Sequence, residues 1–134
     1  MRRTALRKGL RMKENSITVL VVEDEVIVRM DIAHALEAAG FSVLEAGDAD
    51  EAIAILSERD DIRVLFTDID MPGSMDGLKL AAAVRDRWPP IKIIVTSGHS
   101  YMSDDTLPVE GRFFGKPYHH KHIIKAVREM GMVN

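Results

Sequence analysis

Residues 18–24 read Thr-Val-Leu-Val-Val-Glu-Asp, a short apolar run that ends in two carboxylates. Further apolar runs begin near residues 41, 64, 91 and 112, and three of these also end in polar side chains. The polar residues are Thr67 and Asp68, then Thr96 and Ser97, and last Lys116. If the runs are parallel strands, their carboxyl ends lie along one edge of one sheet. That edge would carry three acids, a hydroxyl group and a lysine.

The intervals between the runs have the spacing of helices. In the first interval apolar residues recur at i, i+4, i+7, i+8 and i+11, namely Val28, Ile32, Ala35, Leu36 and Ala39. Gly40 follows, where glycine commonly ends a helix. Asp48 and Glu51 are typical of a capping box, and residues 76–88 and 119–130 predict two more helices. This alternation predicts an α/β fold, a doubly wound five-stranded parallel sheet with helices on both faces.

The interval between the last two runs, residues 98–111, differs from the others. Few apolar residues recur there at helical spacing. Pro108 would also break any helix that reached it. We therefore expect the fourth helix to be short or irregular.

The composition bounds the class of protein. The 134 residues fit one domain, and the 46% hydrophobic content supplies a mainly aliphatic core, because aromatic residues make up only 5%. There is no cysteine, which excludes disulfides and a thiol nucleophile. No apolar stretch approaches the roughly 20 residues that span a bilayer, and the N-terminus lacks the apolar segment of a signal peptide. We expect a cytoplasmic protein without membrane insertion.

The net charge of −3 hides an asymmetry along the chain. Residues 1–16 hold six basic side chains against Glu14, a net charge of +5, so the rest of the chain carries −8. The acidic body argues against direct nucleic-acid binding by the domain. We expect residues 1–16 to be a disordered basic extension, residues 17–130 the folded domain and residues 131–134 a tail.

The acids at the predicted edge need a counter-ion. Two ionised carboxylates about 4 Å apart repel by roughly 4 kcal/mol at an effective dielectric constant near 20. Glu23, Asp24 and Asp68 would therefore not all stay charged alone. Magnesium, which prefers oxygen ligands, removes the conflict, and Lys116 adds a second positive charge. The set predicts a magnesium-dependent phosphoryl acceptor, because phosphoryl transfer depends chiefly on positioning and charge neutralisation.

Four motifs carry a resemblance to a known family. They are VLVVEDE (19–25), TDIDMPGSMDGL (67–78), IIVTSG (93–98) and FFGKPY (113–118). In this order they resemble the receiver domain of two-component response regulators, of the stand-alone type. The resemblance implies the flavodoxin-like receiver fold and a sensor histidine kinase or phosphotransfer protein as phosphate donor. It also implies output through an unknown downstream protein, or a role as phosphate relay or sink, with the oligomeric state left open.

The resemblance assigns the acceptor and the metal ligands. Asp68 is identified as the phosphoacceptor. The expected magnesium ligands are Glu23, Asp24, Asp68 and the backbone carbonyl of Asp70. By the same resemblance, Asp70 and His99 set the lifetime of the phosphate, and we expect them to do so by gating water. We expect no enzyme activity beyond the domain's own phosphorylation and dephosphorylation.

The resemblance also assigns a switch. The family register selects Ser97, rather than the adjacent Thr96, as the hydroxyl that turns toward the phosphoryl group. Lys116 contacts a phosphoryl oxygen, and Phe113 is the aromatic switch. The peptide bond between Lys116 and Pro117 is expected to be cis.

Two other functions stay open at this point. Asp68-Ile69-Asp70 also resembles the motif of haloacid-dehalogenase-type phosphatases, in which the second aspartate is a general acid, although Pro72 stands where that motif prefers Thr or Val. The second alternative is a pseudo-receiver, a binding module without phosphorylation. The loop at residues 71–77, one residue longer than the usual receiver form, keeps that alternative open.

Overall fold

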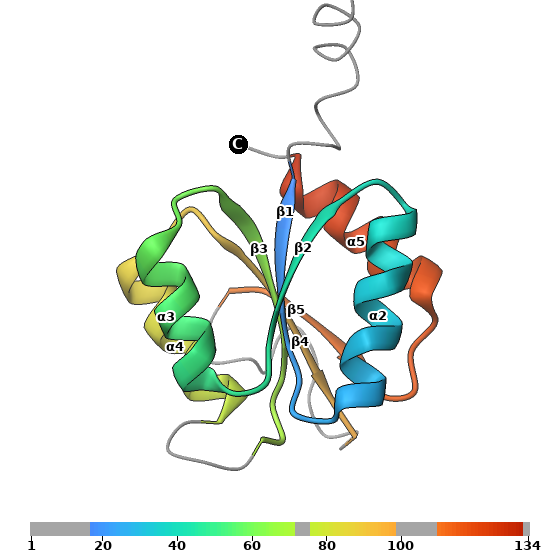
Figure 1. The fold of residues 1–134 in the computed structure, drawn as a ribbon, viewed down its shortest axis with the longest axis horizontal. Coiled ribbons are helices and arrows are strands. Elements are labelled where there is room, and N and C mark those ends of the chain that lie inside the picture. Colours follow the sequence, from blue (N-terminus) through green and yellow to red (C-terminus); the bar gives the residue numbers. More distant parts are fainter. Residues whose placement is uncertain (1–16, 72–75, 99–109, 133–134) are drawn as a thin grey trace, which may run out of the picture.

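The computed structural model describes residues 17–71, 76–98 and 110–132. Five strands and four helices lie in this part of the chain (Figure 1). In chain order they are β1 (Thr18–Val22), α2 (Val26–Ala38), β2 (Ser42–Ala46), α3 (Ala49–Glu58), β3 (Ile62–Asp68), α4 (Gly77–Arg87), β4 (Lys92–Ser97), β5 (Arg112–Gly115) and α5 (His120–Gly131).

All five strands run parallel in one sheet of order β2-β1-β3-β4-β5. Helices α2 and α5 cover one face, and α3 and α4 cover the other (Figure 1). The predicted doubly wound α/β fold is therefore confirmed. The chain begins in the middle of the sheet, goes out to β2 and returns past β1 to β3. Sites in such sheets form where this direction changes, at the carboxyl ends of the central strands.

Strand β1 shows why the sheet is apolar on both faces. All five of its residues are buried, and its four apolar residues divide between two different cores. Val19 and Val21 pack in the cluster formed with α2 and α5. Leu20 and Val22 pack in the cluster formed with α3 and α4. Each fully buried side chain of this size contributes about 1.5–3 kcal/mol of burial free energy, so the two cores hold the strand ends firmly in place.

Two aspartates cap helices near the carboxyl edge. Asp48 Oδ1 accepts a hydrogen bond from the N–H of Glu51 at 2.8 Å, and Asp76 Oδ1 accepts one from the N–H of Lys79 at 2.9 Å. In a complete capping box the Glu51 carboxylate would accept from the N–H of Asp48. Here it accepts from the N–H of Gly47 at 2.7 Å, so only half of the predicted capping box forms. An N-cap of this kind stabilises a helix by about 1 kcal/mol.

Helix α2 buries a slightly different stripe from the one predicted. Its buried residues are Ile32, Ala33 and Leu36, and Ala33 was not in the predicted set. Gly40 has φ of 108°, a left-handed conformation that favours glycine, so its predicted place after the helix is confirmed. The extra residue widens the apolar face that α2 presents to the sheet.

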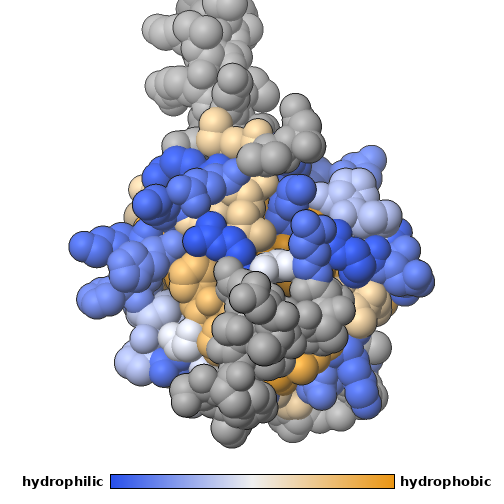
Figure 2. Space-filling model, turned by 180° about the vertical axis from the view of Figure 1, so that it is seen from behind, coloured by the Kyte–Doolittle hydropathy of each residue, from blue (hydrophilic) through white to orange (hydrophobic). Residues whose placement is uncertain are grey.

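Several predictions concern residues outside the described ranges. They are the basic extension at 1–16, the longer loop around 72–75, the short fourth helix within 99–109 and the last two residues of the predicted tail at 131–134, of which Gly131 belongs to α5. Within the described residues, no helix is long and apolar enough to cross a membrane. On the side opposite to that of Figure 1, hydrophilic residues cover much of the surface and hydrophobic residues show only in small patches (Figure 2).

Candidate functional site

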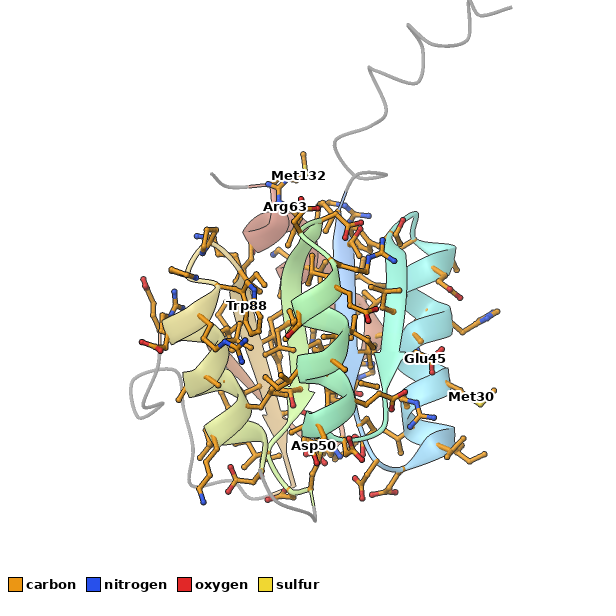
Figure 3. The ribbon with its side chains drawn as sticks, turned by 60° about the vertical axis from the view of Figure 1, so that its left-hand side comes forward. Met30, Glu45, Asp50, Arg63, Trp88 and Met132 are labelled. Atoms are coloured by element: carbon orange, nitrogen blue, oxygen red, sulfur yellow. The ribbon has the colours of Figure 1, made fainter. Side chains whose placement is uncertain are left out.

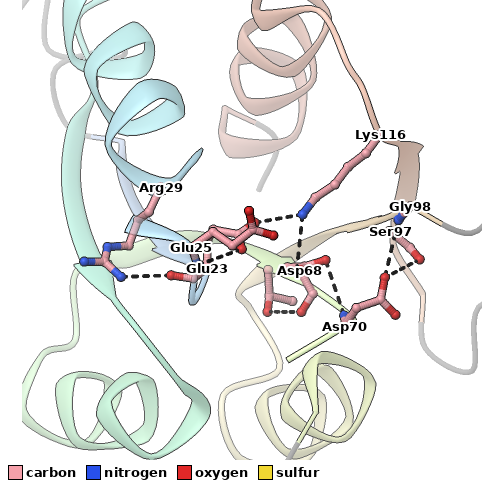
Figure 4. Close-up of polar contacts among 9 residues, drawn as sticks. Glu23, Glu25, Arg29, Asp68, Asp70, Ser97, Gly98 and Lys116 are labelled. Carbon is pink, nitrogen blue, oxygen red and sulfur yellow. Dashed lines mark hydrogen bonds and ion pairs between the residues drawn. The ribbon is translucent and has the colours of Figure 1, made fainter. Parts of the chain in front are cut away.

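Lys116, directly after β5, joins two buried carboxylates at the carboxyl edge of the sheet. Its Nζ lies 3.0 Å from Oε1 of Glu23 and 3.3 Å from Oδ2 of Asp68 (Figure 4). The side chains of Glu23 and Asp68 are 3% and 2% exposed. Glu23 follows β1 and Asp68 ends the neighbouring β3, while Lys116 comes from the far edge strand. The topology thus gathers three segments that are far apart in the sequence.

Asp24 completes an acidic cluster. One carboxylate oxygen from each of Glu23, Asp24 and Asp68 lies within 4.8 Å of the others. Carboxylate oxygens are the ligands that hard divalent cations prefer. A single lysine cannot neutralise three carboxylates, so the donor set fits a magnesium ion.

Burial raises the pKa of both Glu23 and Asp68, because the charged form of a carboxylate is unfavourable away from water. The hydrogen bond from Lys116 opposes this shift at Glu23, and the charge of Lys116 opposes it at Asp68. Burial alone would lower the pKa of Lys116, but its hydrogen bond to Glu23 and the two negative charges outweigh burial and raise it. The lysine therefore stays positively charged, but its single charge does not balance the negative charges of the carboxylates around it.

Asp70 links the predicted acceptor to the end of β4. Its N–H donates to Oδ1 of Asp68 at 3.3 Å. Its Oδ2 accepts from the hydroxyl of Ser97 at 2.9 Å and from the N–H of Gly98 at 3.4 Å (Figure 4). The residue expected to gate water therefore also contacts the expected switch hydroxyl.

Ser97 and Thr96 were rivals for the hydroxyl at this site. Both are 1% exposed. The Ser97 hydroxyl contacts Asp70, as described, whereas the backbone carbonyl of Thr96 accepts from the N–H of Ile69 at 2.8 Å. Which of the two hydroxyls acts at the site stays a prediction, and the side-chain contact with Asp70 is an observation in favour of Ser97.

Two other predicted residues, Phe113 and Pro117, lie in the described part of the chain near the site. Phe113 is half-buried, pairs with Val95 across the sheet and packs against the core on the α3 and α4 side. The peptide bond between Lys116 and Pro117 is cis, in agreement with the prediction. His99 lies outside the described residues.

Arg29 is a residue of the site that the sequence did not reveal. From the second turn of α2 its Nη1 donates to the backbone carbonyl of Glu23 at 2.9 Å (Figure 4). Its Nε donates to Oε1 of Glu45 at 3.2 Å. Arg29 therefore holds the backbone between Glu23 and Asp24. In the sequence it is one arginine on a predicted helix, and no spacing distinguishes it from a solvent-exposed one.

Tyr118 was quoted only as the last residue of a motif, but it is packed closely behind the site. Its ring lies edge-on against Phe66, with the centroids 5.7 Å apart. Burial raises the pKa of its phenol to about 12. Phe66 lies two residues before Asp68 on β3, so this contact supports the strand that carries the predicted acceptor.

Three histidines lie at the start of α5, with His119 as its N-cap. His119 and His122 are exposed. His120 is only partly exposed, and its Nε2 lies 2.8 Å from Oδ2 of Asp31 on α2. This contact ties the two helices on one face together, and only the packing of α2 beside α5 makes it possible.

Comparison with known proteins places this fold and site in a family. The family model of the response regulator receiver domain matches residues 19–128. The response regulator receiver protein CpdR of Brucella abortus (strain 2308) is 30% identical over 115 residues, which cover 84% of this chain and 94% of CpdR. The sensor kinase CckA of the same strain is 38% identical over 121 residues, 86% of this chain. The chain spans only 12% of the length of CckA and 25% of the hydrogenase regulator HoxA of Cupriavidus necator.

Solved structures show the same fold. A receiver domain from the hybrid histidine kinase CckA superimposes with a TM-score of 0.73 at 32% identity, covering 87% of this chain and 99% of that domain. A receiver protein from Sinorhizobium medicae WSM419 gives 0.78 at 28% identity, covering 86% and 94%. The response regulator TrrA of Thermotoga maritima, in complex with Mg(2+)-BeF, gives 0.77 at 23% identity over 85% and 98%, a likeness of fold alone. On the family match, the shared fold and the level of identity, this chain belongs to the receiver domain family of two-component response regulators.

Proposed function

We propose that this chain is the phosphoacceptor of a two-component phosphorelay and that Asp68 is the residue phosphorylated. An oxygen of the Asp68 carboxylate attacks the phosphorus of a phosphohistidine on a sensor histidine kinase or phosphotransfer protein. The P–N bond breaks, the imidazole nitrogen keeps the electron pair, and an acyl phosphate forms on Asp68. The observation that carries the proposal is the Lys116 ammonium 3.3 Å from this buried carboxylate, where it can neutralise phosphoryl oxygens.

Magnesium is the cofactor that suits this proposal. Glu23, Asp24 and Asp68 would hold it, with the backbone carbonyl of Asp70 as a further ligand. When bound, the ion supplies positive charge to the carboxylates and the phosphoryl oxygens. The three convergent carboxylates support this assignment. The magnesium complex of TrrA, a protein of the same fold, adds support by analogy.

The remaining roles follow from the same proposal. The Ser97 hydroxyl turns toward the phosphoryl group, and Phe113 responds to that movement as the aromatic switch. Asp70 and His99 set the lifetime of the acyl phosphate by controlling access of water. Output passes to a downstream protein, or the domain serves as a relay or sink for phosphate.

The exposed apolar side chains of α2 suit a partner helix bundle. Val26, Ile27 and Met30 are 53%, 79% and 56% exposed, and Met30 points away from the body of the protein (Figure 3). A groove of about 460 Å³ beside them is lined by Ile27, Val28, Asp31, Lys116, Pro117, Tyr118 and His120. Lys116 lines this groove and also contacts Asp68, so a partner seated here lies one side chain from the acceptor. We propose this surface as the docking site for the histidine kinase or phosphotransfer protein.

Intact mass spectrometry after incubation with magnesium and acetyl phosphate tests the proposal. In this reaction Asp68 displaces acetate from phosphorus, so one phosphoryl adduct is expected on the wild type and none on Asp68→Asn. Asp86→Asn, at an exposed carboxylate late in α4, is the matched control and should form the adduct normally. Removing magnesium with a chelator should suppress the adduct.

Other outcomes would favour the alternatives. Absence of an adduct on the wild type, both with acetyl phosphate and with a phosphorylated histidine kinase, would contradict the proposal and favour a pseudo-receiver. Sustained turnover of p-nitrophenyl phosphate that depends on Asp68 would favour a haloacid-dehalogenase-type phosphatase.

A further inference from the structure

The hydroxyl of Ser97 is already engaged in this structure. A hydroxyl group has one proton to donate, and Ser97 donates it to Oδ2 of Asp70 at 2.9 Å. Ser97 is 1% exposed, so water cannot easily replace a lost partner. Before Ser97 can donate to a phosphoryl oxygen on Asp68, this hydrogen bond to Asp70 must break.

Asp70 holds more than one group at the end of β4. The same oxygen lies 3.4 Å from the N–H of Gly98, the residue at which the chain leaves the strand. On its other side, the backbone N–H of Asp70 donates to Oδ1 of Asp68 at 3.3 Å. One residue therefore connects the acceptor carboxylate with the end of the neighbouring strand.

Phosphorylation of Asp68 would weaken the hydrogen bond between Ser97 and Asp70 in two ways. The phosphoryl group brings about two negative charges close to the Asp70 carboxylate, and like charges repel. It also offers Ser97 a more highly charged acceptor. The existing bond is 2.9 Å long, whereas strong hydroxyl-to-carboxylate bonds are about 2.5–2.7 Å, so it is of a kind that can be exchanged.

We propose that the Asp70 carboxylate is a latch that holds Ser97 and Gly98 in the unphosphorylated arrangement and that must open when Asp68 is phosphorylated. This inference rests on the proposed function of Asp68 as phosphoacceptor. Asp70 is a positioning residue in this role, because its carboxylate acts through Ser97. The free energy needed to open the latch reduces the affinity of the site for a phosphoryl group.

A double-mutant cycle with beryllofluoride as phosphoryl analogue tests the latch. The dissociation constant of beryllofluoride, at saturating magnesium, is measured for the wild type, Asp70→Ala, Ser97→Ala and the double variant. Asp70→Ala should bind beryllofluoride about three- to ten-fold more tightly, the equivalent of one hydrogen bond no longer broken. With Ser97 already replaced by alanine, the gain from the same change should be at least about three-fold smaller, because only the relief of charge repulsion then remains. Asp70→Asn, which keeps an acceptor oxygen, should fall between wild type and Asp70→Ala.

The cycle separates the latch from simple charge removal. An equal gain in both Ser97 backgrounds would show that Asp70 acts only by its charge, and an unchanged or weaker affinity of Asp70→Ala would also overturn the latch. Asp86→Ala, a loss of one carboxylate away from these contacts, should leave the affinity unchanged. Thermal unfolding of each variant confirms that it is folded. Failure of the wild type itself to bind beryllofluoride with magnesium would overturn the proposed function and the latch together.

Discussion

The carboxyl edge and the amino edge of the sheet each hold an ion pair, and the two pairs have similar distances but different solvent exposure. At the carboxyl edge, Lys116 lies 3.0 Å from Glu23, whose side chain is 3% exposed. At the amino edge, Arg59 lies 2.6 Å from Asp61 just before β3, with side chains 44% and 47% exposed. The shorter contact belongs to the exposed pair.

Solvent exposure decides what each pair does. Burial raises the pKa of Glu23 despite its lysine partner, whereas the hydrogen bond from Arg59 lowers the pKa of Asp61. Water screens the exposed pair, so it contributes little to stability. The buried pair has lost hydration of the Glu23 carboxylate, a cost that suits the chemical role proposed for it. Distance between charges is therefore a poor guide to function, and burial is a better one.

The largest expected difference between the carboxyl edge and the amino edge is in the loss of stability when a glycine at each edge is replaced by alanine. A Cβ on Gly77 would lie 1.9 Å from the carbonyl oxygen of Asp68 and 2.7 Å from Cα of Ile69, which are backbone atoms that cannot move aside cheaply. A Cβ on Gly131 would lie 2.9 Å from Cγ2 of Ile17, a side-chain atom at the amino edge. We expect Gly77→Ala to lower the free energy of unfolding by about 3 kcal/mol. Gly131→Ala should change it by less than about 1 kcal/mol, because helix propensity offsets the contact.

Urea unfolding of both glycine variants measures this difference. Gly77→Ala should also lose phosphorylation, since the displaced atoms include the backbone of Asp68. Similar free energies of unfolding for the two variants would contradict this prediction, since they would mean that the backbone at the carboxyl edge shifts to accept a Cβ as easily as the side chain at the amino edge.

A second test removes the cation from each pair. In the absence of divalent cations, Lys116→Met leaves two buried carboxylates without their positive partner. It should therefore destabilise the fold by about 2–3 kcal/mol. This is somewhat less than for a fully buried pair, because Lys116 is partly exposed. Arg59→Met should leave stability and phosphorylation without measurable change. Adding magnesium should restore part of the stability of Lys116→Met but not its phosphorylation rate. Equal losses for the two variants in urea unfolding would contradict the comparison.

The smallest expected effect is a pH dependence of opposite sign at the two edges. Because the pKa of Glu23 is raised in the fold, the protonated form contributes stability below the unfolded value of 4.5, and this contribution is lost as pH rises through the folded pKa. Asp68, with an unfolded value of 3.8, behaves in the same way. The pKa of Asp61 is lowered, so its contribution is complete above 3.8 and is lost only in more acidic solution.

Melting temperatures of the metal-free protein between about pH 5 and about pH 7 test this sign. The stability of Glu23→Gln relative to wild type should increase with pH across this window. Asp61→Asn should show no such trend, and saturating magnesium should remove the trend for Glu23→Gln. A constant difference between Glu23→Gln and wild type would show that Glu23 does not titrate in this range.

The fold was predictable from the sequence because its signals are local and repeated. Apolar runs mark the strands, and Asp48 and Gly40 stand at helix ends with their own hydrogen-bond and φ requirements. Ala33 was missed because a small residue beside an apolar stripe carries no signal of its burial.

The residues of the candidate site were predictable in part. Glu23 and Lys116 each follow a strand and Asp68 ends one, and parallel strands end at a common edge, so their approach follows from topology. The contacts of Arg29 with Glu23, and of His120 with Asp31, were not foreseen. Both join a helix to another element across the fold, where sequence separation says nothing about distance.

The sequence by itself determined which residues could carry the chemistry and on which edge of the sheet they would meet, because both follow from the order of strands and their terminal residues. The tertiary structure alone decided which oxygen accepts from which donor. That Lys116 bridges Glu23 and Asp68, and that Ser97 donates to Asp70 in this arrangement, depends on side-chain positions and burial that only the packed helices and sheet impose. Such contacts arise between segments that are distant along the chain, and their strength depends on how far the surrounding fold excludes water.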